Sequence, residues 1–308
     1  MASRDYTALY DASIDKHILK SFETWKSTIP DLFHVDNTTR RFVTHQGWQG
    51  YGLPTPRFPG EVIVEGDVHQ SFNKQYSMQS VGMGDSIPLE DIEDDPTGML
   101  TQGSAMIAGG LAESFKDHVE LQAATFLING FTVTAGQPDG VSLFSLTHPR
   151  SLNNSTVTDA NRPTTGVDMS VSTVEQMITR LRLQRSPNGR PMHNKPRVMW
   201  YNPSLDFVAQ KIMKQSAEAF TTDRNDSVIN RKYGGIKLCE LPYLQEAGVD
   251  SDAWGMIGQM HFLYFIWRNK FRAHHDFDAR TKTHLVMGDI RFDLGESSYL
   301  GTDASPGA

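Results

Sequence analysis

A long stretch without internal proline near the middle of the chain constrains the fold more than any other feature. After Pro96 no further proline occurs up to Asn129, and apolar side chains recur there at three- to four-residue steps. The stripe consists of Ala108, Leu111, Phe115, Val119 and Phe126, with Gln122 in line. This pattern predicts a helix over 96–129, which would be about 50 Å long at 1.5 Å per residue. Such a helix favours an elongated plate over a compact ball, whose radius of gyration at this size is about 20 Å.

The start of this helix follows an acidic segment. Its carboxylates are Asp85, Glu90, Asp91, Glu93, Asp94 and Asp95. Asp95 is a suitable helix cap, Pro96 fits the first helical position, and acidic groups stabilise the positive helix end. A calcium or magnesium site is the alternative, although the spacing matches no EF-hand loop. Glycines in the first half of the helix allow a break near Gly109.

The segments before the helix are of two kinds. Residues 1–30 have the apolar periodicity of an amphipathic helical arm that ends at Pro30. Residues 41–84 are rich in glycine and proline, and Val62–Val64 and Tyr76–Met78 are candidate strands. A long two-stranded projection fits this composition best. Because a two-stranded ribbon is marginally stable alone, we expect it to lie against another chain.

The second half of the chain mixes helices and strands without strict alternation. Residues 150–170 are a polar connection, followed by an expected helix around Val174–Leu181. A strand at Arg197–Trp200 and a helix at Asp206–Ala219 come next. Further strands are expected at Ile236–Leu241, His261–Trp267 and Thr283–Asp293, with the connections YLQEAGVDSDAWG and RAHHDFDARTK between them. The order argues for an α+β fold and against a doubly wound sheet.

Composition excludes several classes of protein. The 308 residues carry a net charge of −7, which disfavours a dedicated nucleic-acid binder. The single cysteine, Cys239, rules out an internal disulfide and a cysteine-based zinc cluster. The first residues lack a signal-peptide pattern, and the apolar run Phe262–Trp267 is too short to cross a bilayer. We therefore expect a soluble protein of a reducing compartment, with no membrane partner.

One basic stretch stands out against this acidity. Between Gln176 and Leu205 there are six basic residues and no acidic one. They are Arg180, Arg182, Arg185, Arg190, Lys195 and Arg197. A solvated face with a flexible loop at SPNGRP is one interpretation. Contact with an acidic neighbour or with nucleic-acid phosphates is the other.

The segment GVSLFSLTHP contains the residue types of nucleophilic catalysis, namely Ser142, Ser145 and His148. Closeness in sequence does not make a triad, and no G-x-S-x-G, phosphate-loop or H-E-x-x-H motif occurs. His274, His275, Asp276 and Asp278 form the best metal candidate, but adjacent strand residues point to opposite faces. Cys239 is explained as a small apolar strand residue. We assign no catalytic, cofactor-binding or metal-binding residue and expect no cofactor.

The order of parts resembles that of the major capsid proteins of tailed bacteriophages, within them the Mu-like major head subunit group. IPLEDIEDDPTGML is similar to the family's lead into its long helix, and ELQAATFLINGF to the end of that helix. DGVSLFSLTHP, YNPSLDFVAQKIMKQS and the ending RFDLGESSYLGTDASPG are also similar to family segments. In this comparison GVSLFSLTHP is a structural corner, anchored by Leu143, Phe144 and Leu146.

The resemblance implies the α+β fold of the Hong Kong 97 type and a division into four parts. Residues 1–40 would be the N-terminal arm, and 41–84 the extended loop over an adjacent subunit. Residues 85–165 would form the peripheral domain around the long helix, completed by about 286–308. Residues 166–285 would form the axial domain.

The implied function is that of a major capsid protein, not an enzyme. Its partners would be many copies of itself in pentamers and hexamers, packaged DNA on the inner face, and possible portal, scaffold and decoration proteins. Some relatives cross-link a lysine to an asparagine, but for Lys74 no asparagine partner or catalytic acid is matched. Two alternatives stay open: a bacterial nanocompartment shell, and a soluble hydrolase that uses His148 or the His274–His275 pair.

Overall fold

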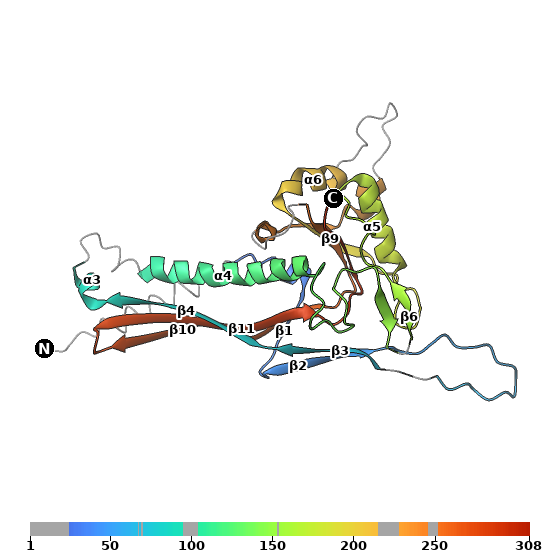
Figure 1. The fold of residues 1–308 in the computed structure, drawn as a ribbon, viewed down its shortest axis with the longest axis horizontal. Helices are drawn as coiled ribbons and strands as arrows, with labels where there is room; N and C mark the ends of the chain where they lie inside the picture. The colour runs from blue at the N-terminus through green and yellow to red at the C-terminus, as the bar shows by residue number, and fades with distance from the viewer. Residues whose placement is uncertain are drawn as a thin grey trace, which may run out of the picture.

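The protein is an elongated platform that carries a compact domain at one end, with a long segment projecting past that end (Figure 1). A computed structural model describes residues 25–66, 68, 70–94, 104–152, 154–214, 228–245 and 252–308. Most of the helical arm predicted over 1–30 lies outside these residues. Pro30 does not end a helix as expected but lies in the first turn of the short helix α2 (Ile29–Leu32). Proline fits there because the first helical N–H groups have no intrahelical partner.

The platform consists of the predicted long helix and a four-stranded sheet, here called the long sheet. The helix α4 (Ser104–Asn129) is about 39 Å long and runs along the sheet (Figure 1). The strand order is β1 (His34–Asn37), β10 (Leu263–Asp278), β11 (Thr283–Glu296) and β4 (Gln79–Pro88). β1 is parallel to β10, and the other pairs are antiparallel. A short helix, α3 (Leu89–Glu93), follows β4.

The helix is confirmed where the structure describes it, since residues 95–103, with the expected cap at Asp95, lie outside the described part. The expected break near Gly109 was wrong, because α4 continues through Gly109 and Gly110. Packing explains the continuity: the next two turns bury Leu111, Ala112 and Phe115. Tertiary burial of one face outweighs the roughly 1 kcal/mol that each glycine costs a helix.

The compact domain is built on a second sheet. Its strand order is β12 (Thr302–Ser305), β9 (Trp254–Gly258), β7 (Pro196–Tyr201) and β8 (Lys237–Glu240). Its helices are α5 (Val171–Leu183), α6 (Asp206–Lys214) and α7 (Val228–Tyr233). Two 3-10 turns, η1 (Pro203–Leu205) and η2 (Pro242–Leu244), follow β7 and β8. Ser170 begins α5 with a capping box, because its hydroxyl accepts from Thr173 N while Thr173 Oγ1 accepts from Ser170 N.

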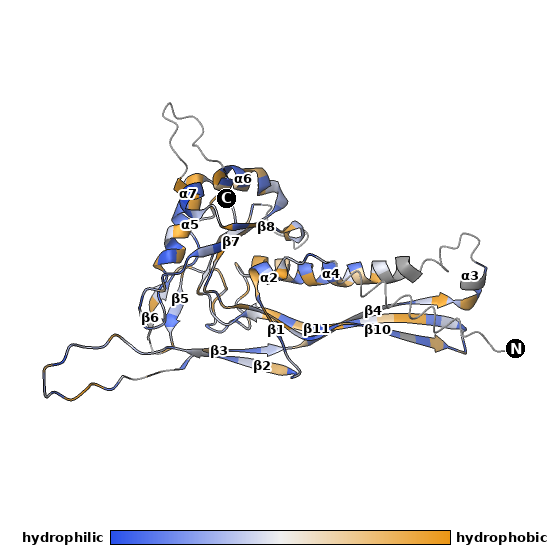
Figure 2. Ribbon diagram, turned by 180° about the vertical axis from the view of Figure 1, so that it is seen from behind, coloured by the Kyte–Doolittle hydropathy of each residue, from blue (hydrophilic) through white to orange (hydrophobic). Residues whose placement is uncertain are grey.

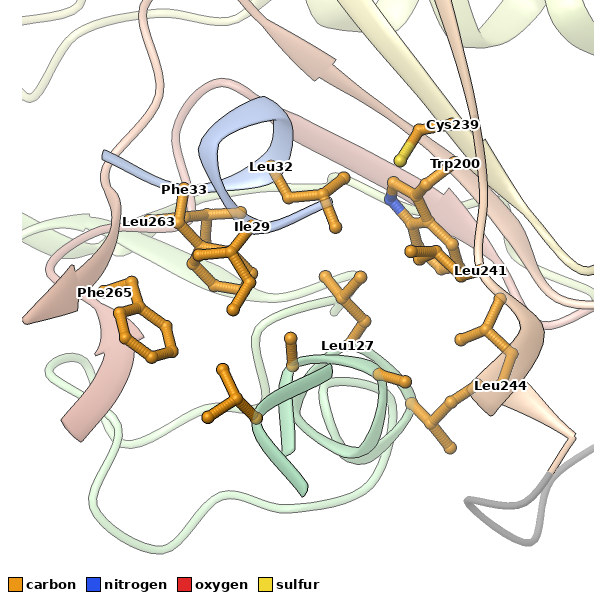
Figure 3. Packing of buried hydrophobic residues seen from close by; sticks show 14 of the residues in the cluster. Ile29, Leu32, Phe33, Leu127, Trp200, Cys239, Leu241, Leu244, Leu263 and Phe265 are labelled. Carbon is orange, nitrogen blue, oxygen red and sulfur yellow. The ribbon is translucent and has the colours of Figure 1, made fainter. Parts of the chain in front are cut away.

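The second sheet contacts a different core on each face. Met199 and Tyr201 of β7 pack with the residues of α5, α6 and α7. Val198 and Trp200 alternate to the other face and join the core around α4. In that core, shown in Figure 3, Leu127 lies between α2 and residues of the second sheet and η2. The shared core makes the platform and the compact domain one packed body.

The two-stranded projection forms, and of the two expected strands Tyr76–Met78 overlaps the end of an observed strand. β2 (Phe42–Trp48) pairs antiparallel with β3 (Gln70–Ser77), and we call this pair the ribbon. Val62–Val64 is not a strand, so that prediction was wrong. Residues 49–66, here called the projecting segment, carry Gly60 at φ +92° and three prolines, each of which lacks the backbone N–H that a strand ladder needs.

Three other expectations were corrected by strand pairing. Residues 150–170 are not only a connection, since β5 (His148–Ser151) and β6 (Asn154–Asp159) form a hairpin there. Most of RAHHDFDARTK continues β10 to Asp278, because β11 supplies a partner along its whole length. β9 lies at the end of the segment YLQEAGVDSDAWG and was missed; all five of its residues are buried, so it shows no alternation of polar and apolar residues.

The two sheets also divide the chain differently from the expected domain boundaries. β10 falls within 166–285 but pairs with β11 in the long sheet. β12 falls within 286–308 but pairs with β9 in the second sheet. The chain crosses between the sheets at 259–262 and again at 297–301, and hydrophobic patterning does not mark such crossings. No helix of the described residues is long and apolar enough to cross a membrane.

Replacing Leu127 tests the core that joins the two sheets. Leu127 is fully buried, so we expect Leu127→Ala to cost about 3 kcal/mol of unfolding free energy through the cavity it leaves. Chemical denaturation would measure this. Glu113→Ala on the exposed side of α4 is the control and is expected to change stability by less than about 0.5 kcal/mol. Equal effects of the two variants would contradict the assigned core.

Candidate functional site

His148, the main catalytic candidate from the sequence, is fully buried in the corner that follows α4. Its Nδ1 lies 2.7 Å from Asp139 Oδ2. Its Nε2 lies 3.2 Å from Leu143 O and 3.1 Å from Asn161 Oδ1. The ring also stacks on Tyr299, with centroids 4.0 Å apart. Both ring nitrogens of His148 are therefore occupied by hydrogen-bond partners within the fold: Asp139 and Leu143 of the corner, and Asn161.

The two candidate nucleophiles have other partners. Ser142 Oγ donates to Phe144 O at 3.3 Å, and Ser145 Oγ accepts from Thr147 N at 3.3 Å. Neither hydroxyl is hydrogen-bonded to the imidazole, so the three residues do not form a nucleophile–base pair. Leu143 and Phe144 are buried as expected, while Leu146 is only half-buried. The arrangement is that of a corner whose short polar side chains satisfy turn groups.

The other candidates do not come together into a site. His274 Nε2 lies 2.7 Å from Asp289 Oδ1 on the exposed side of β10, and the side chain of His275 is not described. In the described part of the chain no group of three or more histidine, cysteine or acidic residues has metal-site geometry. Cys239 is buried, and burial raises the pKa of its thiol to about 12, which makes it a poor nucleophile.

The basic stretch does not form one free positive face. Arg180 makes a bidentate ion pair with the buried Asp303, at 2.7 and 2.8 Å. Arg182 donates to Tyr233 Oη, and Arg197 donates to Asp31 O. Arg185 and Arg190 lie at the turn of SPNGRP and donate to backbone carbonyls. Five of the six basic residues thus contribute to the fold of the compact domain or its contacts.

A buried carboxylate that the sequence reasoning missed lies at the end of β11, paired in register with Leu263 of β10. Glu296 is 2% exposed, and neither of its carboxylate oxygens has a hydrogen-bond partner among the described residues. Burial raises its pKa from 4.5 to about 7, against the opposing effect of the Lys74 ammonium. Lys74 Nζ itself donates to Gly136 O at 2.6 Å. The alternation of β11 buries every second residue from His284 to Phe292, and continuing this period would place Glu296 on the same face, which was the available signal.

The ribbon is attached to the end of β11 by a group of polar contacts. Ser77 N donates to Asp293 Oδ2 at 2.7 Å, and Tyr76 Oη lies 2.9 Å from Ser297 Oγ. His45 of β2 packs edge-on against Tyr264 of β10, with centroids 4.3 Å apart. These contacts fix the base of the ribbon on the face of the long sheet.

The projecting segment exposes apolar side chains that the rest of the chain does not cover. Val62, Ile63 and Val64 are 89%, 70% and 77% exposed. Leu53, Phe58 and Tyr51 are exposed as well, and Figure 2 shows hydrophobic residues along this segment. A concentration of large apolar groups on a single protruding segment is typical of an interaction surface. It is the strongest candidate for a functional surface in the described part of the molecule.

Solved structures of phage capsids have the same architecture as this chain. It matches the capsid of Ralstonia phage GP4 with a TM-score of 0.57 at 12% identity, over 90% of this chain and 87% of that chain. The capsid of the cyanophage P-SCSP1u matches with a TM-score of 0.57 at 10% identity, over 91% and 88% of the two chains. The chain has the Hong Kong 97-type fold.

The same fold also occurs in a virus-like particle from Pyrococcus furiosus. That structure matches with a TM-score of 0.50 at 10% identity, over 96% of this chain and 99% of that chain. No protein-family model and no curated protein sequence matches the chain. The Hong Kong 97-type fold expected from the order of segments is confirmed, and the matches do not single out a Mu-like group within it.

Replacing His148 tests its structural role. We expect His148→Ala to cost about 3 kcal/mol of unfolding free energy, because it leaves the buried Asp139 carboxylate without its ring partner. His274→Ala removes a His–Asp pair of the same 2.7 Å length at an exposed position, where a loss below about 1 kcal/mol is expected. Thermal unfolding of both variants would check this, and a small effect at His148 would contradict the structural role.

Glu296 predicts a pH dependence of stability. Because its pKa is raised in the fold, the stability it contributes is fully present below about pH 4.5 and is lost as the pH rises through about 7. We expect Glu296→Gln to raise the unfolding free energy at pH 8 by about 3 kcal/mol and to have little effect at pH 4.5. Glu113→Gln is the exposed control. An equal effect of Glu296→Gln at both pH values would contradict the assignment.

Proposed function

We propose that the chain is a major capsid protein that assembles through pentamers and hexamers into an icosahedral head shell around a phage genome. One observation carries the proposal: the Hong Kong 97-type fold extends over about 90% of the chain and of the phage capsid chains it matches. The fold is thus not a module within an otherwise unrelated protein.

The projecting segment supports self-association. The backbone of this segment extends away from the rest of the chain (Figure 1), and its large apolar side chains are exposed. Burying these side chains on a second copy would stabilise the assembled state by about 25 cal/mol for each Å² of apolar surface removed from water. A protruding segment that binds a different surface on its neighbour makes a heterologous contact, and such contacts form rings when the rotation between copies closes. Rings of five and six copies are the units of an icosahedral shell.

The proposed roles follow the four expected parts, except that β10 is assigned to the long sheet and β12 to the second sheet. Residues 1–40 act as the arm, the ribbon with its projecting segment as the extended loop, and α4 with the long sheet as the peripheral domain. The second sheet with α5, α6 and α7 acts as the axial domain around the five- and six-fold axes. Packaged DNA contacts the inner face without sequence specificity, and portal, scaffold and decoration proteins are further partners.

In this proposal the chain works without catalysis or a cofactor, and it assembles in the host cytoplasm into the virion. The buried His148 and the high pKa of the Cys239 thiol support a non-catalytic role. A nanocompartment shell with a protein cargo is the second candidate. It is favoured by the match to the Pyrococcus furiosus particle, which covers 96% of this chain.

Electron microscopy of the purified protein tests the proposal. We expect closed shells or rings of five and six copies. The nucleic-acid content of shells isolated from phage-producing cells, read by absorbance and nuclease protection, separates a genome container from a nanocompartment. Shells that hold only protein would favour the second candidate, and a chain that never assembles, alone or with the other head proteins, would contradict both.

Removing the apolar groups of the projecting segment tests its role. We expect the triple variant Val62→Ser, Ile63→Ser, Val64→Ser to fold normally but to lose assembly, since these side chains contribute little to the chain's own core. Val62→Ile, Ile63→Val, Val64→Ile keeps the apolar surface and is the matched control. Sedimentation with circular dichroism would report both properties. Assembly of the serine variant at the wild-type level would exclude the segment as an interface.

A further inference from the structure

A turn of the compact domain holds the projecting segment where it leaves the ribbon. Asn188 Nδ2 donates to Tyr51 O at 2.8 Å, and Arg190 Nη1 donates to the same oxygen at 3.4 Å. Gln49 Nε2 donates to Pro187 O at 3.4 Å. These bonds join residues 137 to 139 positions apart in the sequence. We call residues 186–190 together with residues 49–51 the clasp.

The turn side of the clasp is held in shape before it meets the segment. Ser186 N donates to Arg190 O and Gly189 N to Ser186 O, both at 2.8 Å. Arg185 Nη1 donates to Gly189 O, also at 2.8 Å. Gly189 has φ +77°, a conformation that glycine adopts without strain. A preorganised turn loses little conformational entropy on binding, so its weak individual bonds hold the segment more firmly than a mobile loop would.

The clasp is the last attachment of the segment to the body in the described chain. The ribbon is anchored on its other side by Ser77 and Tyr76, as described above. A cavity of about 570 Å³ remains between the ribbon and the body, lined among others by Trp48, Phe72, Tyr264 and Pro187. Beyond Tyr51, the hydrogen bonds of residues 52–66 stay within the segment, between Arg57, Phe58 and Glu61.

Because the segment extends far beyond the clasp, a small change of angle at the clasp moves its tip by a large distance. Eight extended residues beyond Tyr51 reach about 26 Å, so a rotation of about 10° at Tyr51 moves the tip by about 5 Å. Beyond Tyr51 the described hydrogen bonds of the segment are internal to it, so none of them ties the tip to the body against such a rotation. The direction of the tip therefore depends on the bonds at Tyr51 O.

We propose that Asn188 and Arg190 are positioning residues that aim the projecting segment relative to the compact domain. The consequence for assembly rests on the proposed function, because the angle between this segment and the compact domain sets where the next copy attaches. The clasp itself is a property of the single chain. The two levels are therefore measured separately.

Asn188→Asp is the sharpest variant. It keeps the size of the side chain but replaces the amide donor by a carboxylate, which repels Tyr51 O and attracts Arg190 away from it. Arg190→Ala removes the second donor. Asn37→Asp makes the same isosteric change at an exposed position of β1 outside the clasp and is the matched control.

The first measurement is a distance distribution in the unassembled chain between spin labels at Thr55→Cys and Lys211→Cys. Both positions are exposed, whereas the native Cys239 is buried and stays unlabelled. We expect one narrow peak with native Asn188 or with Asn37→Asp, and loss of that peak in Asn188→Asp. An unchanged peak in Asn188→Asp, with normal thermal unfolding, would contradict the proposal that Asn188 sets the direction of the segment.

The second measurement is the diameter of assembled particles in electron micrographs. We expect a single diameter with native Asn188 and with Asn37→Asp, and a mixture of diameters or open sheets with Asn188→Asp and Arg190→Ala. If the narrow peak is lost but the particles keep one diameter, the clasp is supported and its consequence for assembly is overturned. If the wild-type chain never assembles, the proposed function fails while the distance measurement still decides the clasp.

Discussion

The burial of one face of α4 between the two sheets is the contact on which the rest of the structure depends. Phe115 and Leu127 of α4 share one core with Phe265 and Val286 of the long sheet and with Trp200 of the second sheet (Figure 3). Because helix and sheets contribute to the same close-packed core, none can shift without opening cavities. The platform and the compact domain are thereby held at one fixed angle. The ribbon, its attachments at Ser297 and the clasp all take their positions from that angle.

A rigid body with one weakly held projection is well suited to repeated assembly. The body is held by one shared core, while the projecting segment carries apolar groups such as Ile63 and Val64 that the chain itself leaves exposed. The clasp limits the direction of the segment without packing it into the core. In the proposed shell, adjacent copies would meet at slightly different angles in five-fold and six-fold settings, and the adjustment would occur at a few hydrogen bonds and not in the core.

The polar groups that the sequence singled out proved to be structural, and the ones that matter most near the ribbon were not singled out. His148 drew attention through its neighbours Ser142 and Ser145, yet its partners are Asp139 and Asn161. Glu296 was not noticed because an acidic residue at a strand end is ordinarily solvated; only the tertiary packing at the end of β11 makes it a buried group with a raised pKa. The contact between Asn188 and Tyr51 joins segments 137 positions apart, and no local pattern records it.

The sequence by itself determined the features that depend on neighbours in the chain. Apolar periodicity specified α4 and α5, and the resemblance of the segments to those of phage capsid proteins indicated the Hong Kong 97-type fold. Only the tertiary structure decided that α4 continues through Gly109, that β10 belongs to the long sheet and that β12 belongs to the second sheet. Helix periods and caps arise from interactions within a few residues, whereas sheet partners, buried charges and the clasp depend on which distant surfaces pack together. That packing is settled by the shared core around α4, which no single segment encodes.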